Sequence, residues 1–188
     1  MVRPADESAA RMKLLRTIML DPSDTFVFDP PAEPGEWAVS GAFCFWHRDP
    51  ASFEGKARSA FRSGFLGVNS LGWSTLVQIV AASEDDRTAL RDLLAKRLLA
   101  HFGAPDEAAA RAAADDEIAF VQSLCSEPQD SLVAVHRTFE NGEVREQFRT
   151  LRPRAGTKPA RAFSFFEVEG EEEPGEAVDL IGMAERKG

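Results

Sequence analysis

The chain has few cysteines: Cys44 and Cys125 are the only two among its 188 residues. Two cysteines cannot build the disulfide framework that stabilises many small secreted domains. Each of them lies in an apolar stretch, where a cysteine ordinarily serves as a small buried hydrophobic residue. We therefore expect both to be free thiols in a protein that works in a reducing compartment.

Long apolar runs are also missing. A membrane-spanning helix needs about 20 consecutive apolar residues, and no segment approaches that length. The apolar run at residues 14–20 is short, contains Arg16 and lacks the small-residue cleavage site of a secretory signal. The sequence therefore predicts a cytoplasmic protein with no membrane partner.

Basic residues are in the minority. The chain has 22 Lys and Arg against 31 Asp and Glu, which gives a formal net charge of -9. Such a surface repels nucleic-acid phosphates and anionic lipid headgroups unless a strong local basic patch is present. We therefore expect no nucleic-acid partner. No sequence motif fixes a reaction or indicates a cofactor, so we expect no cofactor and the sequence leaves open whether the protein is an enzyme.

Apolar residues make up 44% of the chain, which is enough to form the core of one ordinary domain. We expect a flexible leader at residues 1–12, a single α+β domain at 13–168, and an acidic segment with a C-terminal tail at 169–188. Predicted strands lie at residues 13–20, 25–28, 37–46, 73–82 and 162–168, predicted helices at 49–64, 83–103 and 105–128, a loop at 64–72 and a hairpin at 132–151. This order favours a mainly antiparallel sheet with helices packed on one face.

Two local patterns are especially informative. In the strand predicted at residues 37–46 both alternating faces are apolar, so we expect it to be covered on both sides and Phe43 to lie in the core. Ser83 followed by Asp86 is the capping-box pattern of a helix start.

The strongest short-range signal is the dipeptide Asn141-Gly142, which is typical of a two-residue β-hairpin turn. That turn fixes the pairing of the two strands, because a slip of one residue would exchange their faces. It places Arg137 opposite Glu146 on the face that carries the apolar residues. We therefore predict a cross-strand ion pair between them.

The other face of this hairpin is polar and locally basic. It carries His136, Arg145 and Arg149, which could together bind a carboxylate or phosphate because arginine holds such groups through two hydrogen bonds. The alternative is an ordinary solvated sheet face whose arginines pair with surface carboxylates.

Other patterns predict no site. Cys44 and His47 have a zinc-like spacing, but residues three apart on a strand face opposite ways and no second ligand pair exists, so we expect no metal. A nucleophilic pair of a cysteine and a histidine assembled in space stays open. The glycine-rich segment 64–72 lacks the strand-loop-helix order and the lysine of a phosphate-binding loop.

Four segments of the chain resemble an uncharacterised family of short bacterial proteins of unknown function. They are residues 13–18, 21–28, 33–39 and 145–153, and the similarity covers roughly residues 12–153. The resemblance implies a bacterial origin, no known activity and no catalytic residues.

Three functions remain open. The first is a non-enzymatic accessory role in which the chain binds another protein or a second copy of itself. The second is a binding module for a small anionic ligand, and the third is an enzyme with an unrecognised site. A pocket in which His or Arg side chains converge would favour the second or third function, whereas a flat apolar patch or symmetric pairing of two chains would favour the first.

Overall fold

A computed structural model of the chain describes residues 11–153 and 166–169. The expected leader therefore lies almost entirely outside the described residues, as do the first four residues of the strand expected at 162–168 and nearly all of the acidic segment and tail.

The architecture is α+β, as expected. The described strands form one antiparallel sheet in the order β4-β3-β2-β1-β5-β6-β7-β8. The strands are β1 (Lys13–Ile18), β2 (Trp37–Val39), β3 (Phe65–Gly67), β4 (Trp73–Ser74), β5 (Leu76–Ala81), β6 (Leu132–Glu140), β7 (Glu143–Pro153) and β8 (Phe166–Glu169). The α-helices are α1 (Ser23–Val27), α2 (Gly55–Ser63), α3 (Glu84–His101) and α4 (Glu107–Leu124), and two short 3₁₀ helices are η1 (Ala42–Phe45) and η2 (Pro50–Ser52).

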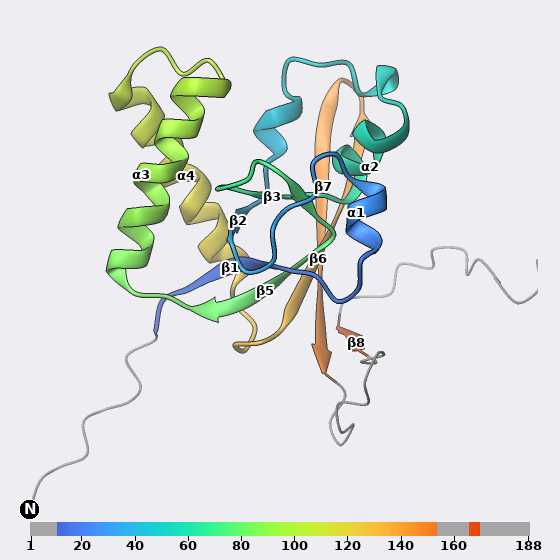
Figure 1. Cartoon of the computed structure of the whole chain (residues 1–188), viewed down its shortest axis with the longest axis vertical. Coiled ribbons are helices and arrows are strands. Elements are labelled where there is room, and N and C mark those ends of the chain that lie inside the picture. The colour runs from blue at the N-terminus through green and yellow to red at the C-terminus, as the bar shows by residue number, and fades with distance from the viewer. Residues whose placement is uncertain (1–10, 154–165, 170–188) are drawn as a thin grey trace, which may run out of the picture.

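The two long helices lie side by side on one side of the molecule (Figure 1). Helix α4 contacts β1 and β2, and α2 contacts β6 near the other end of the sheet. The core lies between these helices and the sheet, and its fully buried members include Leu14, Ile79, Leu94 and Ile118.

Several local predictions are confirmed. Ser83 and Asp86 form the expected capping box at the start of α3. Asn141 and Gly142 both have positive φ, and the hairpin has the expected register. The helix predicted at residues 49–64 is wrong in its first part: Asp49 caps only the short helix η2, by accepting a hydrogen bond from the backbone N–H of Ala51, and α2 begins separately at Gly55.

The strand predicted at residues 25–28 is wrong, because residues 25–27 belong to helix α1 and Phe28 follows as its C-cap. Thr25 donates a hydrogen bond through its hydroxyl to the carbonyl of Pro22, and the Asp24 carboxylate accepts from Thr75. The first bond closes a helical turn, and the bonds to Thr75 hold that turn against the start of β5; the β-branched composition alone indicates neither.

The strand predicted at residues 37–46 ends early, at Val39. Gly41 has a φ of 78°, a left-handed conformation that ends the strand, and the 3₁₀ helix η1 follows. A Cβ at this glycine would lie 2.7 Å from the Cβ of Leu66, so the close approach also requires glycine. As a result Phe45 is buried, Phe43 is only half-buried and Trp46 is 68% exposed. The prediction that the whole segment is buried is therefore wrong at its end.

The loop predicted at residues 64–72 contains strand β3, which pairs with both β2 and β4. The glycines in this segment allow close packing: a Cβ at Gly67 would overlap the Glu36 carboxylate, and one at Gly72 would meet the backbone of Pro31. Glycine composition predicts a loop, whereas here it serves the close approach of neighbouring chain segments.

Candidate functional site

Between α4 and the hairpin lies an ionic cluster of Ser40, Glu117, Arg137 and Glu146, which we call the buried cluster; Ser40 and Arg137 are buried, and the two carboxylates are half-buried. Arg137 on β6 is 1% exposed and its Nε donates to the Glu146 carboxylate on β7 at 2.9 Å. The predicted cross-strand ion pair is therefore confirmed. Ser40, directly after β2, donates its hydroxyl proton to the same carboxylate at 2.5 Å.

The remaining guanidinium protons of Arg137 bond to backbone carbonyls. One terminal nitrogen donates to the carbonyls of Phe61 at 3.2 Å and Gly64 at 2.7 Å at the end of α2, and the other donates to the carbonyl of Ser40. A buried arginine is tolerated only when it is paired and hydrogen-bonded in this way. Arg137 therefore links β2, α2 and β7, and its donors are fully used within the protein.

Glu117 on α4 is the second carboxylate of the cluster, and no ion pair forms on it within the described part of the chain. Its Oε1 accepts a hydrogen bond from the backbone N–H of Gly41 at 3.3 Å. Burial raises the pKa of the Glu117 carboxyl above its usual range, and the nearby charge of Glu146 adds to the rise. The hydrogen bond from the Gly41 N–H and the charge of Arg137 both lower the pKa of Glu117, but by less than burial raises it.

Cys44 in η1 lies next to this cluster. Burial raises the pKa of its thiol to about 12, because the neighbouring charge of Arg137 lowers it too little to compensate. The thiol therefore stays protonated at neutral pH, and a protonated thiol is a poor nucleophile. Both cysteines are free thiols, as expected. Among the described residues, no group of three or more His, Cys, Asp or Glu side chains could hold a metal ion.

An apolar groove opens beside Glu117, between η1 and the turn that joins α3 to α4. Its volume is about 520 Å³, within the range of sites that bind ligands. The groove is lined by Phe43, Trp46, His47, Leu98, Phe102, Gly103, Ala104, Pro105, Ala109, Ala113, Asp116 and Glu117. Its walls are aromatic and aliphatic, with the two carboxylates and one imidazole as its charged or titratable groups.

The local sequence explains why this space is open. Gly103, with a φ of 74°, ends α3, and Pro105 leads to Asp106, whose side chain caps α4. Helix α4 then presents the small side chains of Ala109 and Ala113, one turn apart, to the groove. Opposite them, the early end of β2 carries the chain away from the sheet and leaves Trp46 exposed.

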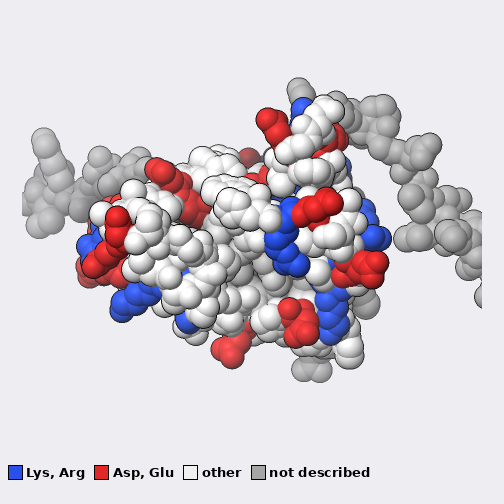
Figure 2. Space-filling view, turned by 90° about the horizontal axis from the view of Figure 1, so that it is seen from above, with Lys and Arg blue, Asp and Glu red and all other residues white. Residues whose placement is uncertain are grey.

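The α3–α4 turn lies at the top of Figure 1, and Figure 2 views the molecule from that end. The middle of this face is a broad uncharged area, with acidic and basic side chains toward its sides. An exposed tryptophan beside an apolar groove is the kind of surface at which proteins bind partners.

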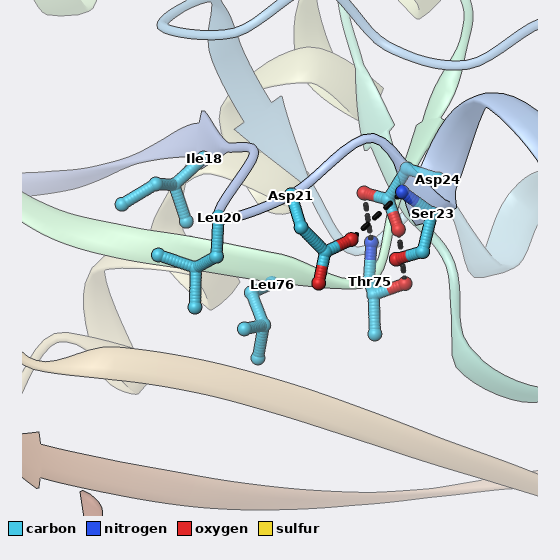
Figure 3. Close-up of a pocket in the computed structure, with 7 residues that line it drawn as sticks. All are labelled: Ile18, Leu20, Asp21, Ser23, Asp24, Thr75 and Leu76. Carbon is cyan, nitrogen blue, oxygen red and sulfur yellow. Dashed lines mark hydrogen bonds between the residues drawn. The ribbon is translucent and has the colours of Figure 1, made fainter. Parts of the chain in front are cut away.

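A second, smaller pocket of about 110 Å³ lies between the end of β1 and the start of β5 (Figure 3). Its polar groups bond to one another. The Asp24 carboxylate accepts from both the N–H and the hydroxyl of Thr75, and Asp21 accepts from the N–H of Ser23. This pocket stabilises the corner between β1 and α1, and its carboxylates are already used.

The structure places the three predicted anion-binding residues on the exposed face of the hairpin. His136 is opposite Gln147, between the pairs that contain Arg145 and Arg149, as the register predicts. Arg145 forms an exposed ion pair with Glu140 at 3.6 Å, whereas no ion pair forms on Arg149 within the described residues. None of the three lines the groove.

Sequence reasoning missed the residues of the groove. In the sequence, Glu117 belongs to an acidic run that predicts a solvated helix face. Its position one residue before the buried Ile118 is the only feature that distinguishes it from the other acidic residues of the run. Trp46 lies at the end of a segment whose composition indicates a buried strand. The turn at Gly41 determines where both residues lie, and the sequence does not reveal the conformation of this glycine.

Comparison with known proteins identifies a family and no individual relative. No curated protein matches the chain, and no solved structure matches it. No helix in the described part of the chain is long and apolar enough to cross a membrane. The sequence model of a family of unknown function, DUF6505, matches residues 12–165, which is most of the chain. The protein belongs to that family.

Proposed function

We propose that this protein is a non-enzymatic accessory protein of the bacterial cytoplasm, and that its apolar groove binds a segment of a partner protein. The observation that carries the proposal is the groove itself. It combines aromatic walls, the exposed Trp46 and two alanines on α4 that leave room for a partner's side chains. Tryptophan is enriched among the residues that dominate the free energy of protein association.

The chemistry around the groove favours binding over catalysis. The nearest thiol, Cys44, is held protonated by burial, and the donors of Arg137 are used by Glu146 and by backbone carbonyls. The groups of the buried cluster therefore stabilise the wall of the groove. The groove surfaces available to a partner are apolar side chains and carboxylate oxygens.

The test is a selection of peptides from a random 12-residue library displayed on phage, with the full chain as bait. The matched bait is Ala113→Trp, which fills the groove from a solvent-exposed position of α4. We expect peptides that are enriched on the natural chain to contain large apolar residues and to lose binding to Ala113→Trp. Peptides that bind both baits equally would contradict the proposal.

A second copy of the chain is the other conceivable occupant. Light scattering of the natural chain and of Ala113→Trp decides between the two. If the natural chain is a dimer that this substitution dissociates, the occupant is another copy and the proposal of a different partner is wrong. A monomer in both cases agrees with the proposal.

A second candidate function is the binding of a small anion or an acidic segment by His136, Arg145 and Arg149. It is favoured by the register, in which Arg145 and Arg149 each lie two residues from Gln147, the partner of His136, and by the absence of an ion pair on Arg149 within the described residues. It predicts that changing both arginines to Ala abolishes salt-sensitive binding of inorganic phosphate. Unchanged phosphate binding in that variant would mean that these residues form an ordinary solvated face.

A further inference from the structure

The groove contains an uncompensated negative charge. Asp116 and Glu117 both line it, and neither forms an ion pair within the described part of the chain. Their neighbour on the same helix, Asp115, differs in this respect because it pairs with Arg87 at 3.3 Å. The described residues that line the groove include no lysine or arginine.

Among the described residues, no cation of the protein forms an ion pair with Glu117. Arg137 is the nearest, but its Nε is bonded to Glu146 and its terminal nitrogens are bonded to backbone carbonyls. Within the described residues only backbone N–H groups, those of Gly41 and Ser40, donate to the Glu117 carboxylate, which can accept more hydrogen bonds than these. A carboxylate in an apolar site is stabilised most by a cation that enters with the ligand.

We infer that the segment bound in the groove carries a lysine or arginine, whose cationic group pairs with Glu117 while neighbouring apolar side chains contact Trp46 and Phe102. This inference rests on the proposed function and specifies its partner. Charge complementarity supports it at two scales: the two carboxylates in the groove, and a whole chain with a net charge of -9. The partner segment is therefore basic and amphipathic.

The inference can be tested with small molecules that carry the two features. The probes are 4-phenylbutylamine, 4-phenylbutan-1-ol and 4-phenylbutanoate, which share a phenyl ring and a four-carbon chain and end in a cation, a neutral group and an anion. Each is titrated into the ¹⁵N-labelled full chain at pH 7, and the amide shifts of α4 report binding in the groove. We expect the amine to bind at least about tenfold more tightly than the alcohol, as for a close and partly desolvated charge pair.

Glu117→Gln is the decisive variant, because it keeps the shape and the acceptor toward Gly41 and removes only the charge. It should reduce the preference for the amine to about twofold or less. Asp116→Asn, at the more exposed carboxylate, is the matched control and should keep most of the preference. The alcohol should bind the natural chain and Glu117→Gln equally.

The possible failures differ. If all three probes bind the groove equally, the cationic anchor is wrong and the proposed function survives. If the amine is preferred but Glu117→Gln changes nothing, the cation lies elsewhere and the inference is also wrong. If no probe shifts the α4 amides, both the inference and the proposed groove fail.

Discussion

The residue that organises the interior is Arg137. A side chain with a permanent charge is fully buried here because one carboxylate and several carbonyl oxygens surround it. Removing one partner of such a pair leaves a buried charge without compensation, and the usual cost is larger than the net contribution of the pair. The stability of the hairpin and of the end of α2 therefore depends on Glu146.

Glu146→Ala should lower the free energy of unfolding by about 3–5 kcal/mol, because it leaves the charge of Arg137 buried without its carboxylate partner. Urea denaturation followed by circular dichroism measures this loss. Glu143→Ala, an exposed carboxylate on the same strand, is the control and should change stability by no more than about 0.5 kcal/mol. A loss below about 1 kcal/mol for Glu146→Ala would show that Arg137 reaches solvent.

Glu117 should make a different contribution, with the opposite sign at neutral pH. Because burial raises its pKa in the folded chain, its ionised form is less favourable there than in the unfolded chain. The favourable contribution is fully present below the unfolded pKa and is lost as the pH rises through the folded pKa. Glu117→Gln should therefore be more stable than the natural chain at pH 7, and the difference should shrink as the pH falls toward about 4.

Urea denaturation of the two proteins between pH 4 and pH 8 measures this difference. The titratable groups near Glu117 are Arg137, Glu146 and Cys44 from the surrounding elements, with Asp116 and His47 beside it in the groove. Asp116→Asn serves as the control for the general effect of removing a negative charge. A natural chain that is more stable than Glu117→Gln at pH 7 would mean that the protein stabilises the ionised form of Glu117.

At the scale of elements, the decisive feature is the early end of β2. Had the strand continued to residue 46, the apolar alternation would have placed Phe43 in the core, as the sequence predicts. Instead Gly41 turns the chain into η1, and Phe45 packs against Phe53, Phe61 and Trp73, with ring centroids 5.2–5.7 Å apart. Phe43 therefore lies outside this aromatic cluster and lines the groove.

Phenylalanine-to-alanine changes at these two positions should therefore differ. Phe45→Ala should cost about 3–5 kcal/mol of unfolding free energy, as for a buried core phenylalanine. Phe43→Ala should cost clearly less, since that side chain is half-buried against Phe102 at the groove. Urea denaturation compares them, and equal losses would mean that the segment is a buried strand after all.

A glycine-to-alanine comparison tests the turn itself. Gly41→Ala suffers both a left-handed backbone and a contact of 2.7 Å with the Cβ of Leu66, whereas Gly35, with a φ of 81°, has no atom within 4 Å of its Cβ position. Gly35→Ala should cost about 1–2 kcal/mol from the backbone alone. Gly41→Ala should cost more, and equal thermal-denaturation midpoints for the two variants would count against the tight packing of this turn.

Much of the fold could be predicted from the sequence because it follows from local chemistry. Ser83 with Asp86 fixes the start of α3, and Asn141-Gly142 fixes the register of the hairpin and with it the pairing of Arg137 with Glu146. The candidate site could not be predicted in the same way. It depends on the φ of Gly41 and on the packing of the α3–α4 turn against η1, which join residues far apart in the sequence and leave no short motif.

At the scale of the whole molecule, the buried cluster and the groove form one unit. Arg137 and Glu146 hold the ends of β2 and α2 in place, and Glu117 connects this interior to the groove through Gly41. The groove wall is therefore rigid on the sheet side. A pre-formed wall of this kind lowers the entropic cost of binding a partner segment.

The most direct test of a partner-binding groove uses the three tryptophans of the chain. Trp46 lines the groove, whereas Trp37 lies under the guanidinium of Arg16 and Trp73 is buried among the core phenylalanines. The full chain labelled with 5-fluorotryptophan is titrated with a peptide selected on the natural chain, and ¹⁹F NMR follows the three signals. We expect the Trp46 signal to shift while the other two stay in place, and a bound peptide that leaves the Trp46 signal unchanged would show that the groove is not the binding site.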